Sequence, residues 1–202
     1  MEEALQDIGI PVFHDDQHGT AIVVRAAIIN AAKVVKKEVS DLTIVISGAG
    51  AAGVAITKLL SGSVHNIIVT DSKGIISINR TDLNSTKQEL LNTINSGDIS
   101  GNLEDALNGA DVFIGVSKAG IVTKEMIKSM KEDSIVLAMA NPVPEIMPDI
   151  AKSAGAAIVG TGRSDFPNQV NNPDIKRSPG KGFTYPPHKR ITRGACSVYR
   201  KK

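Results

Sequence analysis

Residues 42–60 constrain the fold most, because they read as a strand, a glycine-rich turn and a helix in direct succession. Residues 42–47 are a β-branched apolar run, and Gly48-Ala-Gly-Ala-Ala-Gly53 leads from it into an apolar helical run that ends near Leu60. A second β-branched run, Asn66–Asp71, completes a strand–helix–strand unit. A GxGxxG turn in this setting is typical of dinucleotide-binding domains of the Rossmann type.

Each glycine of this turn has a separate predicted role. Gly48 makes the tight turn, Gly50 lets a pyrophosphate approach the backbone, and Gly53 lets the helix pack closely on its strand. The predicted cofactor-binding residues of the turn are Gly48, Ala49, Gly50, Ala51, Ala52 and Gly53. Asp71 follows the first glycine at close to the ~20-residue spacing at which an acidic side chain meets the adenosine ribose. The alternative, a glycine-rich turn that binds nothing, leaves Asp71 unexplained.

The choice of dinucleotide depends on Asp71, Ser72 and Lys73, which we assign to the cofactor site. The Asp71 carboxylate repels a 2′-phosphate and favours NAD. Ser72 and Lys73 offer a hydroxyl and a cation that would bind the same phosphate. We therefore expect NAD as the cofactor, with NADP as the alternative.

The rest of the chain alternates between predicted strands and helices. A short extra strand is expected at 75–79 and a helix at 80–95. Further helices are predicted at 102–107, 123–130 and 145–153, and further strands at 111–115, 134–138 and 156–159. This alternation predicts a doubly wound α/β fold with a parallel sheet. Ligands of such sheets bind beyond the carboxyl ends of the strands, which adds Val116, Ser117 and Asn141 to the predicted cofactor-binding residues.

A compact polar cluster at residues 14–20 precedes a long apolar run at 21–35, which predicts a core helix. Its two adjacent acids need a cation, a helix N-terminus or solvent to offset their charge. Three interpretations remain open from the local sequence. The cluster is an exposed turn with Thr20 as the helix N-cap, or it binds Mg²⁺ or Mn²⁺ through Asp16 and Asp15, or its two histidines bind zinc. The glycine and the two acids argue against a helix within the cluster and so against the zinc site.

Composition and charge exclude several classes of protein. No apolar run approaches the ~20 residues of a membrane span, and residues 1–7 lack the basic start and apolar core of a signal peptide, so we expect a cytoplasmic protein with no membrane partner. The single cysteine, Cys196, excludes an internal disulfide. Residues 173–202 hold nine Lys/Arg and one Asp, whereas the rest of the chain is acidic overall. The net charge of +2 therefore predicts no specific nucleic-acid partner.

We divide the chain into a cofactor-binding domain at 1–172 and an irregular basic tail at 173–202. The tail is rich in proline, glycine and basic residues, shows no hydrophobic periodicity, has the look of a shifted reading frame and is expected to be disordered. The polar run at 167–172 before it predicts a loop, with hydroxy- or keto-acid binding as the alternative.

Several motifs of the chain together resemble one enzyme family. They are, in order, Phe13-His-Asp-Asp-Gln-His-Gly-Thr-Ala21, the GAGAAG turn, Asp71-Ser-Lys-Gly74, Ala140-Asn-Pro142 and Gly162-Arg-Ser-Asp-Phe-Pro-Asn-Gln-Val-Asn-Asn172. The same motifs in this order are similar to the NAD-binding half of bacterial and archaeal malic enzymes, over about residues 2–172. The resemblance implies oxidative decarboxylation of malate to pyruvate and CO₂ with reduction of NAD or NADP.

The resemblance also implies roles for single residues. Asp16 is expected to be a ligand of Mg²⁺ or Mn²⁺, Asp15 beside it a catalytic residue, and Asn141 and Asn171 contacts of the substrate or the nicotinamide. The expected partner is the family's N-terminal domain, with its tyrosine acid, lysine base and two further acidic ligands, in a homo-oligomer when complete. The chain alone is expected to be nearly inactive. A non-catalytic NAD-binding domain, or the cofactor domain of another amino- or hydroxy-acid dehydrogenase, is the alternative.

Overall fold

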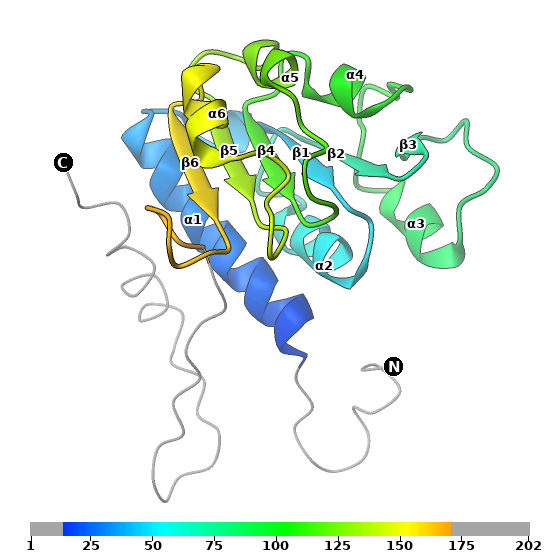
Figure 1. Ribbon diagram of the computed structural model, residues 1–202. Coiled ribbons are helices and arrows are strands. Elements are labelled where there is room, and N and C mark those ends of the chain that lie inside the picture. Colours follow the sequence, from blue (N-terminus) through cyan, green and yellow to red (C-terminus); the bar gives the residue numbers. More distant parts are fainter. Residues whose placement is uncertain (1–13, 171–202) are drawn as a thin grey trace, which may run out of the picture.

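The structure is a computed structural model that describes residues 14–170 (Figure 1). Its strands form one sheet in the order β3-β2-β1-β4-β5-β6. The strands are β1 (Thr43–Ser47), β2 (Asn66–Asp71), β3 (Gly74–Ile75), β4 (Val112–Gly115), β5 (Ile135–Ala138) and β6 (Ile158–Thr161). The helices are α1 (Thr20–Val34), α2 (Ala51–Leu60), α3 (Ser85–Leu90), α4 (Leu103–Leu107), α5 (Lys124–Lys128) and α6 (Pro148–Ser153). The predicted doubly wound α/β fold is confirmed, with β3 antiparallel to β2 and all other neighbours parallel.

The core consists of two apolar layers separated by the sheet. Successive side chains of a strand point to opposite faces, so Ile44 and Ile46 of β1 pack with α1 and α2, whereas Val45 packs in the layer of α4, α5 and α6. Figure 1 shows these two sets of helices on opposite sides of the sheet. Because both faces are covered, the middle residues of β1 and β2 and all residues of β4, β5 and β6 are buried, and these strands read as continuous apolar runs.

The carboxyl ends of the parallel strands lie at one edge of the sheet, where the arrowheads of Figure 1 point. Helix α2 starts at this edge, directly after β1, and α1 also has its N-terminal end on this side of the molecule (Figure 1). The fold therefore gathers the glycine turn, the ends of β2, β4 and β5, and the start of α1 at one edge.

The polar cluster before α1 is helical, contrary to the sequence argument. A π-helical turn, Asp15–Gly19, leads into α1, and the N–H of Thr20 donates to the carbonyl of Asp15. Thr20 is therefore the first residue of α1 and not its N-cap, and the exposed-turn interpretation is wrong. The turn packs against α1 and α2, and Gly19 is buried. This packing outweighs the low helix propensity of glycine and aspartate.

Four other predicted elements have different bounds in the structure. Of the helix predicted at 80–95, only Ser85–Leu90 is helical, because Asn84 caps α3 through the N–H of Lys87. The helix predicted at 145–153 begins only at Pro148, and strand β6 extends beyond its predicted end to Thr161. The extra strand predicted at 75–79 is the two-residue β3. The predicted tail at 173–202 and the domain boundary at 172 lie outside the described residues.

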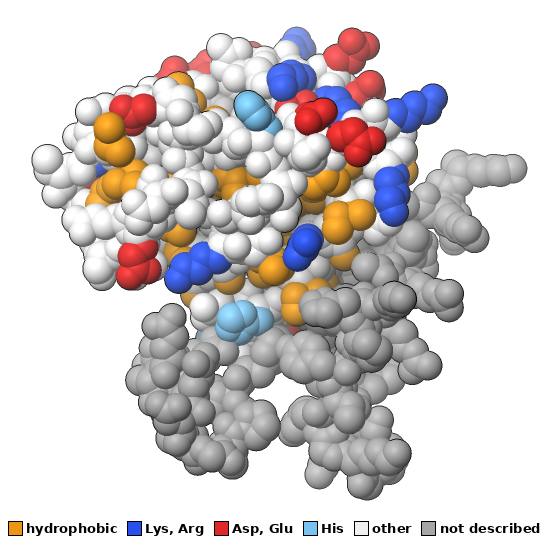
Figure 2. All heavy atoms as spheres, turned by 180° about the vertical axis from the view of Figure 1, so that it is seen from behind, with side chains coloured by type: hydrophobic (Ala, Val, Ile, Leu, Met, Phe, Trp, Pro, Cys, Tyr) orange, Lys and Arg blue, Asp and Glu red, His pale blue; other side chains and the backbone are white. Residues whose placement is uncertain are grey.

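The surface of residues 14–170 carries scattered apolar side chains. The exposed large ones are Val34, Ile78, Ile99, Val143 and Ile150. Seen from behind, hydrophobic side chains appear in several separate places among polar and charged ones (Figure 2). In the described part of the chain, no helix has the length and apolar character needed to cross a bilayer.

Candidate functional site

The glycine turn after β1 is shaped by two close backbone contacts. Gly48 has a φ of +119°, in the left-handed region, and a Cβ there would lie 2.6 Å from the carbonyl oxygen of Val116. A Cβ on Gly53 would lie 1.7 Å from the carbonyl oxygen of Gly48. A Cβ on Gly50, in contrast, would meet no heavy atom of residues 14–170 within 4 Å. Packing therefore requires glycine at 48 and 53, whereas Gly50 leaves the backbone open to an approaching molecule.

The N-terminus of α2 opens into the same space. Gly50 is the N-cap, no side chain of residues 14–170 caps the helix, and its first helical hydrogen bond runs from Val54 N to Gly50 O over 2.9 Å. By helix geometry, the N–H groups of Ala51, Ala52 and Gly53 have no carbonyl partner within the helix. Such a helix start, with the positive end of its dipole, suits an anion such as a pyrophosphate.

A pocket of about 690 Å³ lies at the carboxyl ends of β1 and β2 and reaches the segment after β4. This volume falls in the usual range of small-molecule sites, about 300–1,000 Å³. The predicted cofactor residues that line it are Gly48, Ala49, Gly50, Asp71, Ser72, Lys73 and Ser117. Val116 packs against Gly48 behind the turn. The structure thus brings most of the predicted cofactor residues into one pocket.

The Asp71 carboxylate at the end of β2 is held by two cations. Its Oδ1 lies 2.8 Å from Nη1 of Arg80, and its Oδ2 lies 2.6 Å from Nζ of Lys87. The backbone N–H of Lys73 also donates to Oδ1, over 2.9 Å. Burial alone would raise the pKa of Asp71, but these hydrogen bonds outweigh it and lower the pKa to about 2. Asp71 is therefore ionised at neutral pH, and its charge is offset by its partners.

Asp82 extends this cluster on the outer side of the pocket. The Arg80 guanidinium donates to both oxygens of Asp82, over 2.9 and 2.8 Å, and Nζ of Lys73 lies 2.8 Å from Asp82. Three cations, Arg80, Lys73 and Lys87, therefore surround two carboxylates, and the cluster as a whole is positive. This charge lies beside Ser72, where the sequence places the adenosine ribose.

The segment after β4 forms the other wall of the pocket. The N–H of Val116 donates to the carbonyl of Ser47 over 2.9 Å, and the hydroxyls of Ser47 and Ser117 lie 3.0 Å apart. The N–H of Ser117 donates to Oε1 of Glu145 over 3.0 Å. The ends of β1 and β4 are therefore bonded to each other at the site.

Asn141 is not among the residues that line this pocket. It is exposed, follows β5, and forms a cis peptide bond with Pro142. The Arg163 guanidinium donates to the carbonyl of Pro142 over 2.6 Å and also binds Asp165. The other predicted substrate contact, Asn171, lies outside the described residues.

Asp15 and Asp16 lie in the π-helical turn before α1. Asp16 is exposed and Asp15 is half-buried. Within residues 14–170, no three Asp, Glu, His or Cys side chains are grouped so that they could hold a metal ion. The described residues alone therefore do not form a complete site for Mg²⁺, Mn²⁺ or zinc.

Several residues of the site were not predicted. Lys87, Asn102, Leu103, Lys118 and Ile121 line the pocket. Lys118 could have been predicted from the sequence, because it directly follows Ser117, a predicted cofactor residue. Lys87 carries no such signal, because a lysine on a short helix is usually a solvated surface residue.

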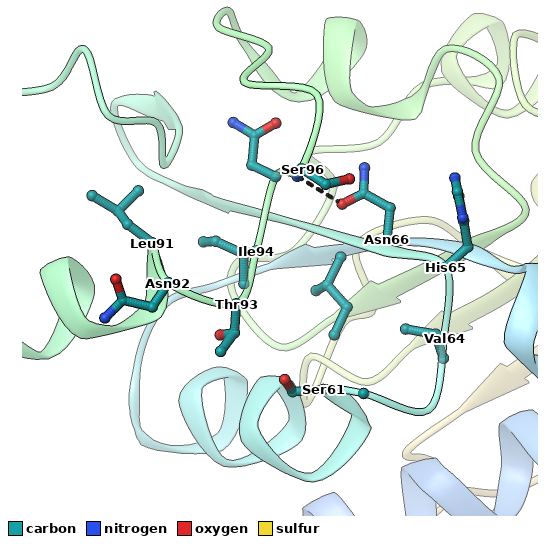
Figure 3. A pocket seen from close by; sticks show the side chains of 12 residues that line it. Ser61, Val64, His65, Asn66, Leu91, Asn92, Thr93, Ile94 and Ser96 are labelled. Atoms are coloured by element: carbon teal, nitrogen blue, oxygen red, sulfur yellow. Dashed lines mark hydrogen bonds between the residues drawn. The ribbon is translucent and has the colours of Figure 1, made fainter.

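A second pocket, of about 310 Å³, lies at the opposite edge of the sheet, near the amino end of β2 (Figure 3). It is lined by the segment between α2 and β2, by the start of β2 and by the segment after α3, and Asn66 accepts a hydrogen bond from the N–H of Ser96 within it. None of the predicted site residues lines this pocket. The glycine-turn pocket is therefore the candidate site.

Known proteins similar to this chain share its fold and much of its sequence. A family model described as "Malic enzyme, NAD binding domain" matches residues 17–186. The bifunctional malic/malolactic enzyme of Bacillus subtilis is 55% identical over 175 residues, which cover 85% of this chain and 43% of that enzyme. The NADP-dependent malic enzyme of Escherichia coli is 46% identical over 177 residues, 85% of this chain and 23% of that enzyme.

A solved structure agrees with these relatives. The crystal structure of an NAD-dependent malic enzyme from Thermotoga maritima matches with a TM-score of 0.81 and 50% identity, over 85% of this chain and 46% of the solved one. The chain therefore spans less than half the length of each of these three proteins.

Proposed function

Because the chain belongs to the malic enzyme family through its NAD-binding domain, we propose that its glycine-turn pocket binds a nicotinamide dinucleotide for the oxidative decarboxylation of malate to pyruvate and CO₂. The observation that carries the proposal is the open backbone at Gly50 beside the uncapped N-terminus of α2. A Cβ at this position meets no atom of the described residues within 4 Å, yet it would occupy the space where a pyrophosphate reaches the helix N-terminus.

The pocket gives the two ends of the dinucleotide different surroundings. We propose that the adenosine ribose binds at Asp71 and Ser72, which line the pocket at the end of β2. The nicotinamide is proposed to lie on the far side of the glycine turn, toward Ser117 and the segment that holds Asn141. The nicotinamide, when bound, accepts the hydride from C2 of malate. The residues of this chain hold the dinucleotide in line for that transfer and exclude water from the buried side of the pocket.

Both NAD and NADP are proposed to bind, with NAD preferred. Asp71 repels a 2′-phosphate, but Arg80 and Lys87 offset its charge at 2.8 and 2.6 Å. Lys73 adds a third cation beside Ser72. Relatives named for NAD and relatives named for NADP both match this chain, which supports a pocket able to accept either.

A divalent ion, Mg²⁺ or Mn²⁺, is proposed to bind with Asp16 as one of its ligands in the complete enzyme. Asp15 lies beside it in the same turn and is proposed to act in catalysis. Because residues 14–170 do not form a full ligand set, the remaining ligands and the acid–base residues are proposed to come from the family's N-terminal domain. The chain alone is therefore expected to be nearly inactive.

A chimera tests this function. Residues 14–170 replace the matching segment of the Bacillus subtilis enzyme, whose other half then supplies the rest of the active site. We expect malate-dependent formation of NADH and pyruvate by the chimera, and none by the isolated chain. A folded chimera that binds NADH without oxidising malate contradicts the proposed activity. Robust turnover by the isolated chain contradicts the proposal that further metal ligands and acid–base residues come from the N-terminal domain.

A further inference from the structure

Glu145 is a buried carboxylate at the carboxyl ends of β4 and β5. Its side chain is 0% exposed, and within residues 14–170 it forms no salt bridge. Burial raises its pKa, and hydrogen bonds from backbone N–H groups counteract part of that rise. Burying a carboxylate without a cation is unfavourable unless hydrogen-bond donors stabilise both of its oxygens. The presence of a glutamate at this buried position therefore needs an explanation other than apolar packing.

The two carboxylate oxygens of Glu145 bind two different strand ends. Oε1 accepts the N–H of Ser117, after β4, over 3.0 Å, and Oε2 accepts the N–H of Ala140, after β5, also over 3.0 Å. The carboxylate lies directly on the backbone of Gly115, where an added Cβ would be 2.3 Å from the Glu145 carboxyl carbon. Gly115 thus leaves room for a carboxylate that joins β4 to β5 at the carboxyl edge.

Glu145 itself is held in place by its backbone. Its carbonyl accepts the N–H of Val122 over 3.1 Å, and the neighbouring carbonyl of Pro144 accepts the N–H of Gly120 over 3.1 Å. These backbone hydrogen bonds hold Glu145 in position independently of its carboxylate, which then binds the ends of β4 and β5.

The segments that Glu145 binds are those that face the nicotinamide under the proposed function. Ser117 lines the pocket and contacts Ser47 through its hydroxyl, at the end of β1. Ala140 directly precedes Asn141. The adenosine side of the pocket, with Asp71 and Lys87, has no bond to Glu145 among the described residues.

We propose that Glu145 is a positioning residue that sets the nicotinamide side of the pocket by holding the N–H groups of Ser117 and Ala140 together. This inference rests on the proposed dinucleotide site and assigns to Glu145 an effect on one half of the ligand only. A glutamine at 145 has a single acceptor oxygen, and its amide NH₂ would face an N–H donor, so one of the two hydrogen bonds is lost.

The test measures the affinity of the full 202-residue chain for two ligands that differ in the nicotinamide, NADH and ADP-ribose. Loss of one buried hydrogen bond is expected to weaken NADH binding by Glu145→Gln about tenfold. ADP-ribose affinity is expected to change less than about twofold, because that ligand does not reach the altered segments. Glu132→Gln, at an exposed glutamate, is the matched control and is expected to bind both ligands like the wild type.

A second variant, Gly115→Ala, disturbs the same carboxylate by changing the residue against which it packs. In Gly115→Ala the new methyl group displaces the carboxylate, so the same selective loss of NADH affinity is expected. Unchanged NADH binding in a folded variant, or an equal loss for both ligands, overturns the inference. So does loss of folding in both variants, which would give Glu145 a purely structural role. A wild-type chain that binds neither ligand overturns the proposed function instead.

Discussion

The contact between Gly53 and Gly48 predicts a specific loss of stability in Gly53→Ala. The new Cβ would lie 1.7 Å from the Gly48 carbonyl oxygen and 2.9 Å from its carbon, both of them backbone atoms that cannot rotate away. An ordinary C···O contact needs roughly 3.3 Å, so α2 and the turn must separate by about 1.5 Å. Overpacking of this kind costs about 3 kcal/mol, at the upper end of its range, and the better helix propensity of alanine offsets about 1 kcal/mol.

The net destabilisation of about 2 kcal/mol corresponds to a melting temperature lower by about 4–8 °C for a chain of this size. Thermal unfolding followed by far-ultraviolet circular dichroism measures it. The control is Gly97→Ala, where the new Cβ meets only Ile99, at 3.9 Å, and we expect its melting temperature to match the wild type. Gly53→Ala is also expected to bind NADH less tightly, because the turn is displaced. A Gly53→Ala protein that melts at or above the wild-type temperature refutes the reasoning.

Three further predictions concern single side chains. Asp111 accepts the N–H of Thr43 and binds two lysines, and these bonds outweigh burial and lower its pKa. Its stabilisation is therefore present above its unfolded pKa of 3.8 and is lost as the pH falls through the lower folded pKa; Asp111→Ala should destabilise the chain by about 1–3 kcal/mol in melts at pH 7, and by progressively less as the pH is lowered below 3.8. Lys87→Met removes one cation from Asp71 and should weaken NADPH binding about fivefold more than NADH binding. The control Lys58→Met should show no such difference, and added salt should reduce the effect of Lys87→Met. Asp16→Ala in the chimera should abolish malate oxidation while NADH binding by fluorescence titration stays intact; retained turnover would refute its assignment as a metal ligand.

The strand–turn–helix unit could be predicted from sequence because its determinants are local. The bounds of β2, Asn66–Asp71, agree with the prediction, since a β-branched run ending in a polar residue needs no information from elsewhere in the chain. The turn at Gly48 likewise follows from a glycine pattern and its flanking runs. In these segments local propensity and tertiary packing favour the same structure.

The remaining features depend on contacts between residues distant in sequence. Arg80 and Lys87 were placed in a helix, and nothing in their neighbourhood indicates that both bind Asp71. Glu145 is the first residue of the helix predicted at 145–153, whereas the fold buries it on Gly115, about 30 residues away. The π-helical turn Asp15–Gly19 forms against α2, a contact that local sequence does not reveal.

The central claim is that the open backbone at Gly50 receives the pyrophosphate of a nicotinamide dinucleotide. Calorimetric titration of the full chain with NADH tests it, in the wild type, in Gly50→Val and in Gly97→Val, a glycine replaced at an exposed turn away from the pocket. We predict saturable, one-site binding by the wild type and Gly97→Val, and none by Gly50→Val. Gly50→Val is expected to fold, because its Cβ meets no atom of residues 14–170 within 4 Å. Absence of binding by a folded wild-type chain, or undiminished binding by Gly50→Val, would contradict the claim.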